Sequence, residues 1–581
     1  MTSGTGADQD CALIYDASTR HWLRFAQPIR TYTADSPETV LSCLRKIDQE
    51  LQFGRRWAAG FLSYESSPAF DAALTVKPQA SFPCLWFGIY PEPEVVSPSF
   101  DTTDIPPIDW EASVTPDEYR ACIRRIKGHI ASGDTYQVNY SFRLNGFFSG
   151  APWNLFSQMV PSYQPGYAAY VRLGRWVICS ASPELFWARQ DGRLWSRPMK
   201  GTASRGLWFQ DDIAKAEWLR QSQKNQAENL MIVDMVRSDL GRVAVHGSVS
   251  VTRLFDVERH PTVWQMTSTV EAQASVSLTD CFRALFPAAS ITGAPKVRTV
   301  DIINRLETTP RRIYTGTMGF VAPDSRAQFN VAIRTLLLNT ANHSAEYGVG
   351  GGIVWDSEEE SEYEECLVKA RTLTQAGPGF QLLETMLWTP EDGYFLLERH
   401  VARLFQSATY FSYPFSRGAI LDRLETQASC FGSNAQRVRL LLSSSDQIQV
   451  ESQPFEPSGA EMRVCLSRDP VDSRDCFLYH KTTRRAVYEN ALRACPGFRD
   501  VILWNERGEI TESTVANVVV KMAGRLFTPP VSSGLLPGTY RALLLEEGKI
   551  SEKVLRRVDL TRCSDIYLIN SVRKMRKTAL D

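Results

Sequence analysis

The strongest constraint on this chain is a break rich in glycine and proline at Gln375-Ala-Gly-Pro-Gly379. Before it lies a charged stretch with helical spacing at residues 358–374, and after it comes a strand-like run that begins at Phe380. Glycine and proline interrupt both helices and strands, so such a cluster between periodic segments predicts a linker. The chain has 581 residues, which is also too long for one hydrophobic core. We therefore predict two domains, residues 1–375 and 376–581.

A softer break, rich in proline, serine and aspartate, spans residues 91–107. It divides an N-terminal subregion, residues 1–106, from a catalytic core, residues 107–375. No separate set of motifs begins after this break, so we expect it to be a surface excursion within one larger unit.

The 64 lysines and arginines nearly cancel the 65 aspartates and glutamates, so no basic excess favours nucleic acid or an anionic membrane as a partner. No apolar run is long enough to cross a bilayer, and the polar start of the chain does not resemble an export signal. The 12 cysteines are scattered singly, without a C-x-x-C pair or a metal-ligand spacing with the seven histidines. We therefore expect reduced thiols in a cytoplasmic protein.

One predicted hairpin in the first domain brings two reactive groups together. Residues 185–189 and 193–197 are strand-like, and the turn Gln190-Asp-Gly192 joins them. If the pair is antiparallel, Glu184 falls opposite residues 198–200. The carboxyl group of Glu184 and the amine of Lys200 would then share one end of the hairpin.

Six short segments of the first domain carry a resemblance to a known family: Asp134-Thr-Tyr-Gln-Val-Asn139, Ala181-Ser-Pro-Glu184, Arg197-Pro-Met-Lys-Gly-Thr202, Ala227-Glu-Asn-Leu-Met-Ile-Val-Asp234, Ile291-Thr-Gly-Ala-Pro-Lys296 and Gly350-Gly-Gly-Ile353. Together they resemble the chorismate-binding enzymes, which implies an α+β chain whose first domain is a β-sandwich with flanking helices. Within that family, aminodeoxychorismate synthases look like Pro-x-Lys-Gly-Thr at the third segment, whereas anthranilate synthases look like Pro-x-Ala-Gly-Thr. This chain has the lysine.

The resemblance assigns roles to the two residues of the hairpin. An amine can add covalently to a ring that an alanine can only touch, so Lys200 is implied to be a nucleophile that holds the chorismate ring until ammonia adds. Glu184 is implied to be the general acid for the departing hydroxyl, since hydroxide is a poor leaving group. Taken singly, a lysine is more often a solvated surface residue. An anthranilate or isochorismate-type synthase remains an alternative, and Lys200 argues against it.

Acidic residues of two predicted helices point to a cation. A capping box is predicted at Ser357–Glu360, and Glu358, Glu362, Glu365 and Lys369 follow at spacings that place them on one stripe of a helix. By spacing alone, a solvated charged face is the simpler reading. Carboxylates that face an anionic substrate need a cation between them, and Mg²⁺ binds one or two protein carboxylates. The family pattern implies that Glu228 and Glu365 bind Mg²⁺, with Glu362 as outer support and Lys369 near the bound acid.

The same pattern implies a pocket for the ring carboxylate of the substrate. Glycines allow close approach of backbone N–H groups to an anion, and an arginine can bind a carboxylate through two parallel hydrogen bonds. The residues implied for this pocket are Gly350, Gly351, Gly352, Arg334, Tyr314 and Ser290. The chain departs from the family at Asn225, where an acidic residue is usual. It departs from the anthranilate synthases at Thr262, Trp264 and Gln265, where those enzymes carry histidines.

The chain has no Gly-x-Cys-x-Gly elbow and no Cys/His/Glu set for glutamine hydrolysis. We therefore expect a separate glutamine amidotransferase subunit to supply ammonia, with free ammonia as a poorer substitute.

A second family pattern begins after residue 380. His480-Lys-Thr-Thr-Arg-Arg-Ala-Val-Tyr488, Asn505-Glu-Arg-Gly-Glu-Ile-Thr-Glu-Ser-Thr-Val-Ala-Asn517 and Gly534-Leu-Leu-Pro-Gly-Thr-Tyr-Arg541 resemble the class IV pyridoxal-phosphate enzymes, which implies an α/β domain. Given the first half, their aminodeoxychorismate lyases fit best. Class IV chains normally carry a further opening strand before the equivalent of Phe380. Either the first half covers the missing edge or the cofactor site is degraded, and we expect retained activity.

The resemblance implies how this domain would hold pyridoxal 5'-phosphate. Lys481 would bind the cofactor covalently and move the proton, and Glu512 would keep its ring nitrogen protonated. Its phosphate would lie against Arg399, Gly538 and Thr539. Thr385 is a further candidate for proton transfer. Taken singly, these residues are more often a surface lysine, a hairpin glutamate and a helix-face arginine.

The joined halves predict a bifunctional enzyme that makes 4-aminobenzoate, a folate precursor, from chorismate and ammonia by way of 4-amino-4-deoxychorismate. Two alternatives concern the second half: a class IV aminotransferase activity, or an inactive dimerisation module. Because class IV enzymes resemble obligate dimers, we also expect a homodimer formed through residues 376–581.

Overall fold

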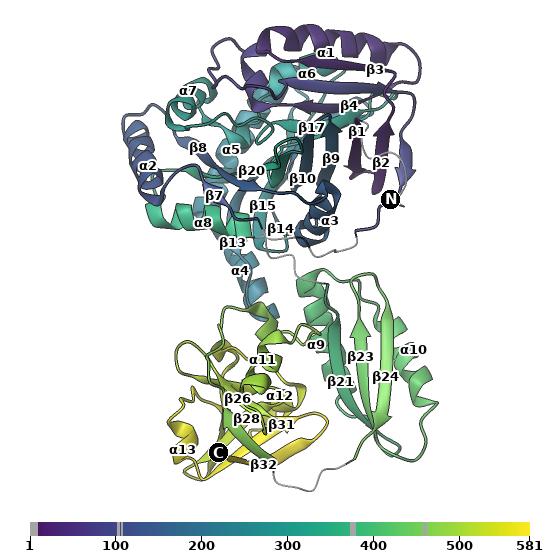
Figure 1. Ribbon diagram of the computed structural model, residues 1–581, viewed down its shortest axis with the longest axis vertical. Helices are drawn as coiled ribbons and strands as arrows, with labels where there is room; N and C mark the ends of the chain where they lie inside the picture. Colours follow the sequence, from purple (N-terminus) through teal and green to yellow (C-terminus); the bar gives the residue numbers. More distant parts are fainter. Residues whose placement is uncertain (1–9, 101–104, 106–107, 372–378, 457–461) are drawn as a thin grey trace. The chain divides into compact units, whose positions relative to one another are not determined.

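The computed structural model describes residues 10–100, 105, 108–371, 379–456 and 462–581. The chain divides into two compact units (Figure 1). The first unit holds Met1–Ser204 and Ala216–Pro378, and the second holds Gly379–Asp581 together with Arg205–Lys215. The boundary predicted at residue 376 lies outside the described residues. The inclusion of residues 205–215 in the second unit was not predicted from the sequence.

One sheet of the first unit has ten antiparallel strands: β1 (Cys11–Asp16), β2 (His21–Ala26), β6 (Glu94–Val96), β7 (Glu111–Ala112), β8 (Gln137–Phe147), β9 (Tyr167–Leu173), β10 (Trp176–Ser182), β16 (Gly293–Ala294), β19 (Thr335–Asn339) and β20 (Ser344–Ile353). Their order is β16-β8-β20-β19-β10-β9-β1-β2-β6, and β7 pairs with β8.

The other sheet of the first unit also has ten antiparallel strands: β3 (Arg30–Ala34), β4 (Trp57–Leu62), β5 (Leu85–Tyr90), β11 (Leu185–Gln190), β12 (Arg193–Arg197), β13 (Met199–Ser204), β14 (Ser250–Arg259), β15 (Val263–Gln273), β17 (Thr317–Val321) and β18 (Ala327–Asn330). Their order is β13-β15-β12-β11-β18-β17-β4-β5-β3, and β14 pairs with β15. Strands β1, β2 and β6 belong to the first sheet, and β3, β4 and β5 belong to the second. The described part of residues 1–106 is therefore built into the sandwich and is not a separate layer.

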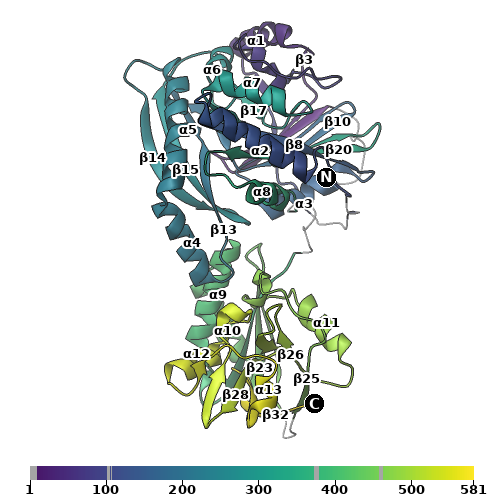
Figure 2. The same cartoon turned by 90° about the vertical axis from the view of Figure 1, so that its left-hand side faces the viewer.

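Helices cover the outer faces of the two sheets. Those on the first sheet are α2 (Pro116–Ala131), α3 (Pro152–Tyr163), α7 (Lys296–Leu306) and α8 (Glu359–Arg371). Those on the second sheet are α1 (Pro37–Gln52), α5 (Gln223–Gly241) and α6 (Leu278–Leu285). Figure 2 shows α2 and α8 side by side, where Arg120 and Arg124 of α2 pair with Glu360 and Glu359 of α8.

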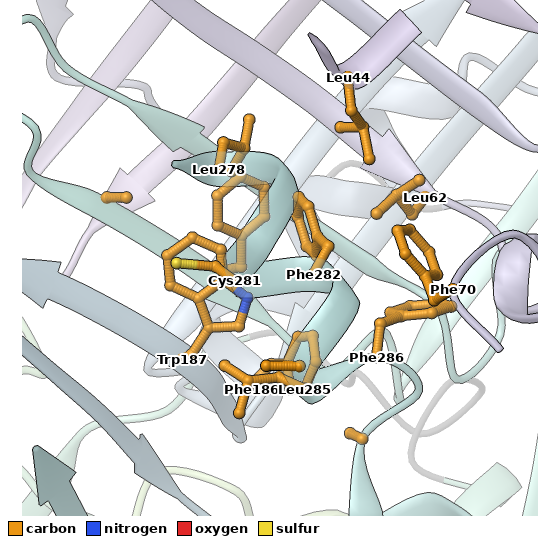
Figure 3. Close-up of a cluster of buried hydrophobic side chains, with 14 of the residues drawn as sticks. Leu44, Leu62, Phe70, Phe186, Trp187, Leu278, Cys281, Phe282, Leu285 and Phe286 are labelled. Carbon is orange, nitrogen blue, oxygen red and sulfur yellow. The ribbon is translucent and has the colours of Figure 1, made fainter. Parts of the chain in front are cut away.

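Apolar side chains fill both the space between the sheets and the space under the helices. Phe25, Phe61, Trp86 and Phe320 are buried between the two sheets. Under α6, aromatic rings contact one another edge to face, including Trp187 with Phe282 and Phe70 with Phe286 (Figure 3). The burial of aromatic rings dominates core energetics, so these layers set the frame that carries the site. The predicted β-sandwich with flanking helices is confirmed.

The second unit has two sheets. The smaller one contains β21 (Leu382–Thr389), β22 (Gly393–Tyr394), β23 (Gln436–Leu442) and β24 (Ile448–Pro454), in the order β22-β21-β23-β24, and packs against α9 (Leu397–Phe411) and α10 (Arg417–Ala428). The larger one contains β25 (Met462–Leu466), β26 (Val501–Trp504), β27 (Ile510–Ser513), β28 (Asn517–Met522), β29 (Arg525–Thr528), β30 (Ser551–Glu552), β31 (Asp565–Asn570) and β32 (Lys574–Leu580). Their order is β27-β26-β25-β32-β31-β28-β29-β30.

The remaining helices include α4 (Phe209–Gln221), which begins in the second unit and ends in the first, and α11 (Ala486–Ala494), α12 (Thr539–Glu546) and α13 (Asp559–Arg562) of the second unit. Across the described ranges, no helix combines the length and the apolar character that a membrane crossing requires.

Candidate active sites

All twelve residues predicted for the first site line one cavity of about 430 Å³ in the first unit. They come from both sheets and from two helices, so the site exists only when the sandwich is assembled. They are Glu184, Lys200, Glu228, Ser290, Tyr314, Arg334, Gly350, Gly351, Gly352, Glu362, Glu365 and Lys369.

The hairpin predicted for Glu184 and Lys200 is confirmed. Strands β11 and β12 pair in antiparallel register with Leu185 opposite Arg197, so Glu184 lies at the end that leads into β13. Glu184 is buried, and burial raises the pKa of its carboxyl group to about 7. Burial also lowers the pKa of the Lys200 amine below its usual range. A carboxylic acid with a raised pKa and an amine with a lowered pKa thus line the same cavity.

The three glycines of β20 do not form the predicted cradle of successive N–H groups. Gly350, Gly351 and Gly352 are paired with β8, opposite Ser141, Tyr140 and Asn139. Alternate residues of a strand point their N–H groups to opposite sides, so successive N–H groups cannot converge on one anion. Instead, the glycines make room, since a Cβ on Gly352 would lie 2.2 Å from Lys200 Nζ and one on Gly351 would lie 3.0 Å from Glu362 Oε2.

The predicted metal ligands lie in the same cavity, with partners of their own. Lys369 Nζ lies 2.8 Å from Glu365 Oε1 and donates to the carbonyl oxygen of Gly350 at 3.0 Å. Ser357 Oγ donates to Glu362 Oε1 at 2.7 Å. The predicted capping box does not form, because α8 begins at Glu359, the Ser357 N–H donates to the Val354 carbonyl oxygen, and Glu360 pairs with Arg120. Among the described residues, no group of three or more acidic, histidine or cysteine side chains is arranged closely enough to hold a metal ion.

Charge crowding nevertheless favours a cation at this end of the cavity. Burial, and then the neighbouring Glu365, raise the pKa of Glu362. The Lys369 ammonium holds the pKa of Glu365 below its usual range. Asn225, which replaces the usual acid of the pattern, donates to Ser222 Oγ at 2.8 Å and also lines the cavity.

Arg334 has a buried donor that is open to a ligand. Its guanidinium carbon lies 5.1 Å from the ring centre of Tyr163. Its Nη1 atom is buried and has no hydrogen-bond partner among the described residues. Leaving a charged donor buried and unpaired is costly, and this atom can donate to a ligand that enters the cavity. Tyr314 is fixed nearby, because a Cβ on Gly348 would meet its ring.

A second cavity, of about 930 Å³, lies in the second unit. Five of the six residues predicted for this unit line it: Thr385, Lys481, Glu512, Gly538 and Thr539. Burial lowers the pKa of Lys481 to about 8, and burial raises the pKa of Glu512 to about 7. Glu512 accepts hydrogen bonds from the Tyr488 hydroxyl at 2.8 Å and from the Leu536 N–H at 3.2 Å, both on Oε1.

The sixth residue, Arg399, was predicted wrongly. Its guanidinium pairs with Glu546 at 2.5 Å, and its side chain is 32% exposed. Arg403, one turn further along α9, lines the cavity instead. The buried face of α9 includes His400, Arg403, Leu404 and Ser407, and this i, i+3, i+4, i+7 spacing is the signal in the sequence that would have selected Arg403 over Arg399.

Arg403 is part of a buried network that sequence reasoning missed. Arg403 Nε donates to Glu384 Oε1 at 2.9 Å and Nη2 donates to Glu384 Oε2 at 2.6 Å. His400 Nδ1 lies 2.6 Å from Glu384 Oε2, and its Nε2 lies 3.2 Å from Thr539 Oγ1. The guanidinium and the hydroxyl at the start of α12 are thus tied to one carboxylate.

The second cavity is strongly cationic. Nine arginines line it, against two carboxylates, Asp500 and Glu512, among the described lining residues. Burial, and then the neighbouring Arg439 and Arg573, lower the pKa of Arg437. Neighbouring positive charges repel one another, and a bound anion offsets this repulsion. The cavity therefore suits a ligand with several negative charges.

Comparisons with known proteins agree with this division. Residues 9–375 match the model of the chorismate binding enzyme family, and residues 381–579 match that of the class IV amino-transferases. Aminodeoxychorismate synthase component 1 of Escherichia coli (strain K12) is 40% identical over 267 residues, which cover 46% of this chain and 58% of that protein. Its counterpart in Bacillus subtilis (strain 168) is 38% identical over 269 residues, 46% of this chain and 57% of that protein. The match thus spans little more than half of these relatives.

Among solved structures, anthranilate synthase component I from Streptococcus pneumoniae TIGR4 superposes with a TM-score of 0.53 at 22% identity, covering 64% of this chain and 94% of that chain. At this identity the likeness shows the fold alone.

Proposed function

Because the chain belongs to the chorismate binding enzyme family and carries a class IV aminotransferase domain, we propose that it makes 4-aminobenzoate in two steps. The first unit would replace the ring hydroxyl of chorismate with ammonia to give 4-amino-4-deoxychorismate. The second unit would remove pyruvate from that intermediate, and the remaining ring would become aromatic.

The first step rests on one observation: Lys200 and Glu184 line the same cavity. At neutral pH an acid with a pKa of about 7 is protonated in about half of the molecules, so Glu184 can give its proton to the departing hydroxyl. Burial disfavours the charged form of Lys200, and a neutral amine has the lone pair that attacks the ring. Water leaves, and ammonia then displaces Lys200 from the adduct. An alanine at this position could not form the adduct.

The substrate carries two carboxylates, and the cavity offers matching cations. The unpaired Nη1 of Arg334 supports binding of one of them. The acidic groups Glu228, Glu362 and Glu365 are oxygen donors of the kind that Mg²⁺ prefers. We propose that Mg²⁺ lies between Glu228 and Glu365, with Glu362 as outer support, and offsets their repulsion toward the substrate. Lys369 would remain near the bound acid.

The donors in the second cavity fit pyridoxal 5'-phosphate. A buried amine, a buried carboxylic group, a guanidinium and a threonine hydroxyl are provided by Lys481, Glu512, Arg403 and Thr539. Gly538 must lack a side chain, since a Cβ there would lie 2.0 Å from Asn517 Oδ1. When bound, the cofactor would supply an electron sink for cleavage at the amine-bearing carbon.

Each residue of this set has a task that its surroundings support. Lys481, with a pKa of about 8, can bind the cofactor covalently and remove the proton from the amine-bearing ring carbon. Glu512 would pair with the cofactor's ring nitrogen, while the Tyr488 hydroxyl holds its other side. Arg403 and Thr539 would hold the phosphate. Thr385 lines the same cavity and is a further candidate for proton transfer.

The cationic character of this cavity suits the lyase reaction. 4-Amino-4-deoxychorismate has two carboxylates, and nine arginines line the cavity, of which Arg439 also pairs with Glu451. A transaminase that uses glutamate binds a dicarboxylate as well, so the two reactions are told apart by their products. The transaminase remains the second candidate for this unit, because class IV aminotransferase is the family that its residues match.

The nitrogen source and the assembly state are part of the proposal. The relatives are named as component 1, which supports a separate glutamine amidotransferase as partner for this chain. Ammonium would replace that partner in vitro. We also propose a homodimer through the second unit, and light scattering of the purified chain tests it.

The test is to incubate the purified chain with chorismate, Mg²⁺ and ammonium, and to identify the product with and without added pyridoxal phosphate. With the cofactor, 4-aminobenzoate and pyruvate are expected in equal amounts. Without it, 4-amino-4-deoxychorismate should accumulate. Anthranilate or isochorismate as the product would contradict the first step, and glutamate-dependent turnover of keto acids would favour the transaminase for the second unit.

A further inference from the structure

Gln137 is a completely buried glutamine at the start of β8. Asn139, two residues further on and therefore on the same face of the strand, lines the first cavity. Neither Nε2 nor Oε1 of Gln137 has a hydrogen-bond partner among the described residues. Leaving a buried polar group unpaired is costly. An amide that is unpaired at both ends therefore calls for a partner among the polar groups beside it.

Gly352 shows what this amide faces. A Cβ on Gly352 would lie 2.2 Å from Lys200 Nζ and 2.6 Å from Gln137 Nε2. The lysine amine and the glutamine amide thus reach the same small space, which is open because residue 352 has no side chain. The strand register agrees, since Gly352 lies opposite Asn139 on the adjacent strand.

The orientation of the amide decides whether the two groups can bond. An ammonium or amine N–H and an amide N–H are both donors. A half-turn of the amide exchanges its oxygen and nitrogen at almost no change in shape. In that orientation Oε1 takes the position beside Lys200 Nζ and can accept one of its hydrogens. A neutral amine held in this way directs its lone pair away from the amide.

We propose that Gln137 is a positioning residue for Lys200, and that its amide oxygen accepts a hydrogen bond from the lysine amine and aims the lone pair at the substrate ring. This inference rests on the proposed role of Lys200 as nucleophile. Gln137 forms no covalent bond. It holds one N–H of Lys200 before the attack and again when ammonia expels the lysine.

Several charged groups act on the same amine. Glu228, Glu184 and Glu362 favour its charged form, whereas Lys369 disfavours it. A neutral amide adds orientation without adding charge, which the carboxylates cannot do. The proposed role of Gln137 is therefore to orient the amine and not to shift its pKa. One substitution can remove the amide, and another can replace it with a carboxylate.

The experiment uses the full chain with saturating ammonium and follows chorismate consumption against pH. Gln137→Met keeps the length of the side chain and removes the amide. We expect its kcat to fall by about 100-fold, the scale of a misplaced reacting group, with the KM for chorismate nearly unchanged. Gln137→Glu places a carboxylate beside Lys200, which raises the pKa of the amine. The rise of activity with pH should then move to higher pH by about one unit.

Gln328→Met is the matched control. Gln328 is also buried, but its Oε1 accepts from the Ala17 N–H at 3.0 Å and its Nε2 donates to the Tyr15 carbonyl at 2.8 Å. It lies outside the residues that line the first cavity. A loss of packing alone would affect both methionine variants through stability, whereas only the Gln137 variants should change the pH profile.

Intact-mass measurement of the Lys200–substrate adduct, without ammonium, separates the outcomes. If wild type forms neither adduct nor aminated product, the proposed function fails. If wild type forms both, and Gln137→Met keeps the wild-type kcat and pH profile, the role of Gln137 is overturned. If Gln137→Met does not fold, Gln137→Glu decides, and an unshifted pH profile in that variant overturns the role.

Discussion

Arg403 and Glu384 form a buried ion pair with two parallel hydrogen bonds, of 2.9 and 2.6 Å. Such a pair fixes the plane of a guanidinium. Arg403 also donates to the carbonyl oxygen of Pro537, at 3.2 Å, just before α12. The remaining surface of the guanidinium faces the second cavity, where an incoming phosphate would meet it.

Arg403→Met should weaken binding of pyridoxal phosphate by about 10- to 100-fold, the effect of losing a charge-assisted hydrogen bond worth about 1.5–3 kcal/mol. Arg399→Met is the matched control on the same helix, because Arg399 pairs with Glu546 at the surface. Titration of the apo chain with the cofactor measures both. Equal effects of the two substitutions would contradict the assignment of Arg403.

Glu384 should make the stability of the second unit depend on pH. Burial opposes its ionisation, yet Arg403 and His400 lower its pKa from 4.5 to about 2. A lowered pKa means that the folded state binds the proton less readily than the unfolded state. The ionised carboxylate therefore contributes about 3 kcal/mol above pH 4.5, and this contribution is lost as the pH falls from 4.5 toward 2.

Glu384→Gln cannot make this contribution. The difference in unfolding free energy between wild type and this variant should be largest near pH 7 and should shrink below pH 4.5. Urea unfolding at a series of pH values measures it. A difference that stays constant down to pH 3 would show that the ion pair does not carry the effect.

The case of Arg399 and Arg403 shows where sequence reasoning stopped. The motif located the right helix. It could not choose between two arginines four residues apart, because the sequence does not show which of them faces the cavity. Only the packing of α9, which buries His400, Arg403 and Leu404 together, separates them. Glu384 was also missed, since a lone glutamate in a strand gives no sign that an arginine and a histidine on another element will enclose it.

Local geometry was more predictable than contacts between distant elements. The hairpin of β11 and β12 could be predicted from its turn and from its two strand-like segments. The antiparallel pairing then gave the end of the hairpin at which Glu184 lies. The sandwich and its flanking helices were expected from the resemblance to the chorismate-binding enzymes. The glycines of β20 were predicted as an anion cradle, because a glycine run by itself does not reveal a partner strand. Pairing with β8 changes their role to making space for Lys200.

Glu184→Gln should slow chorismate amination by about 100- to 10,000-fold, the usual contribution of a general acid. The ratio of the wild-type rate to the variant rate should fall as the pH rises through about 7, because only the wild type depends on the proton of Glu184, whereas both proteins depend equally on Lys200. Glu217→Gln, at a partly exposed ion pair with Arg220, is the control. A ratio that stays level from pH 6 to 9 would argue against Glu184 as the acid.

Lys200→Met should abolish the aminated product, because a thioether cannot add to the ring and be displaced by ammonia. Product analysis by mass spectrometry is the measurement, with wild-type chain incubated in parallel. Folding of the first unit, which contains Lys200, is checked by circular dichroism and by a thermal unfolding scan against wild type. Undiminished formation of 4-amino-4-deoxychorismate by this variant would remove the basis of the proposed first step.

The last prediction concerns Arg205, which lies five residues after Lys200 but belongs to the second unit. Its Nε and Nη2 atoms donate to the two oxygens of Asp212 at 2.7 and 2.8 Å, and Nη2 also donates to the carbonyl oxygen of Tyr410 at 2.8 Å. The Tyr410 ring lies 4.3 Å, centre to centre, from that of His480, the residue before Lys481. Through Tyr410, the segment 205–215 therefore supports the loop that carries Lys481, the reactive lysine of the second cavity.

Arg205→Met should destabilise the second unit by about 3–5 kcal/mol, because it leaves the buried carboxylate of Asp212 without its arginine partner. The double variant Arg205→Met/Asp212→Leu removes both charges and should recover most of that loss, since an apolar pair of similar volume can replace a buried ion pair. Arg220→Met, in an exposed pair on the same helix, should cost less than about 1 kcal/mol. Hydrogen exchange of the peptide around Lys481 provides the readout: faster exchange in Arg205→Met, near wild-type exchange in the double variant, and no change in the control. Equal exchange in all four proteins would mean that the segment only rests on the second unit and does not stabilise it.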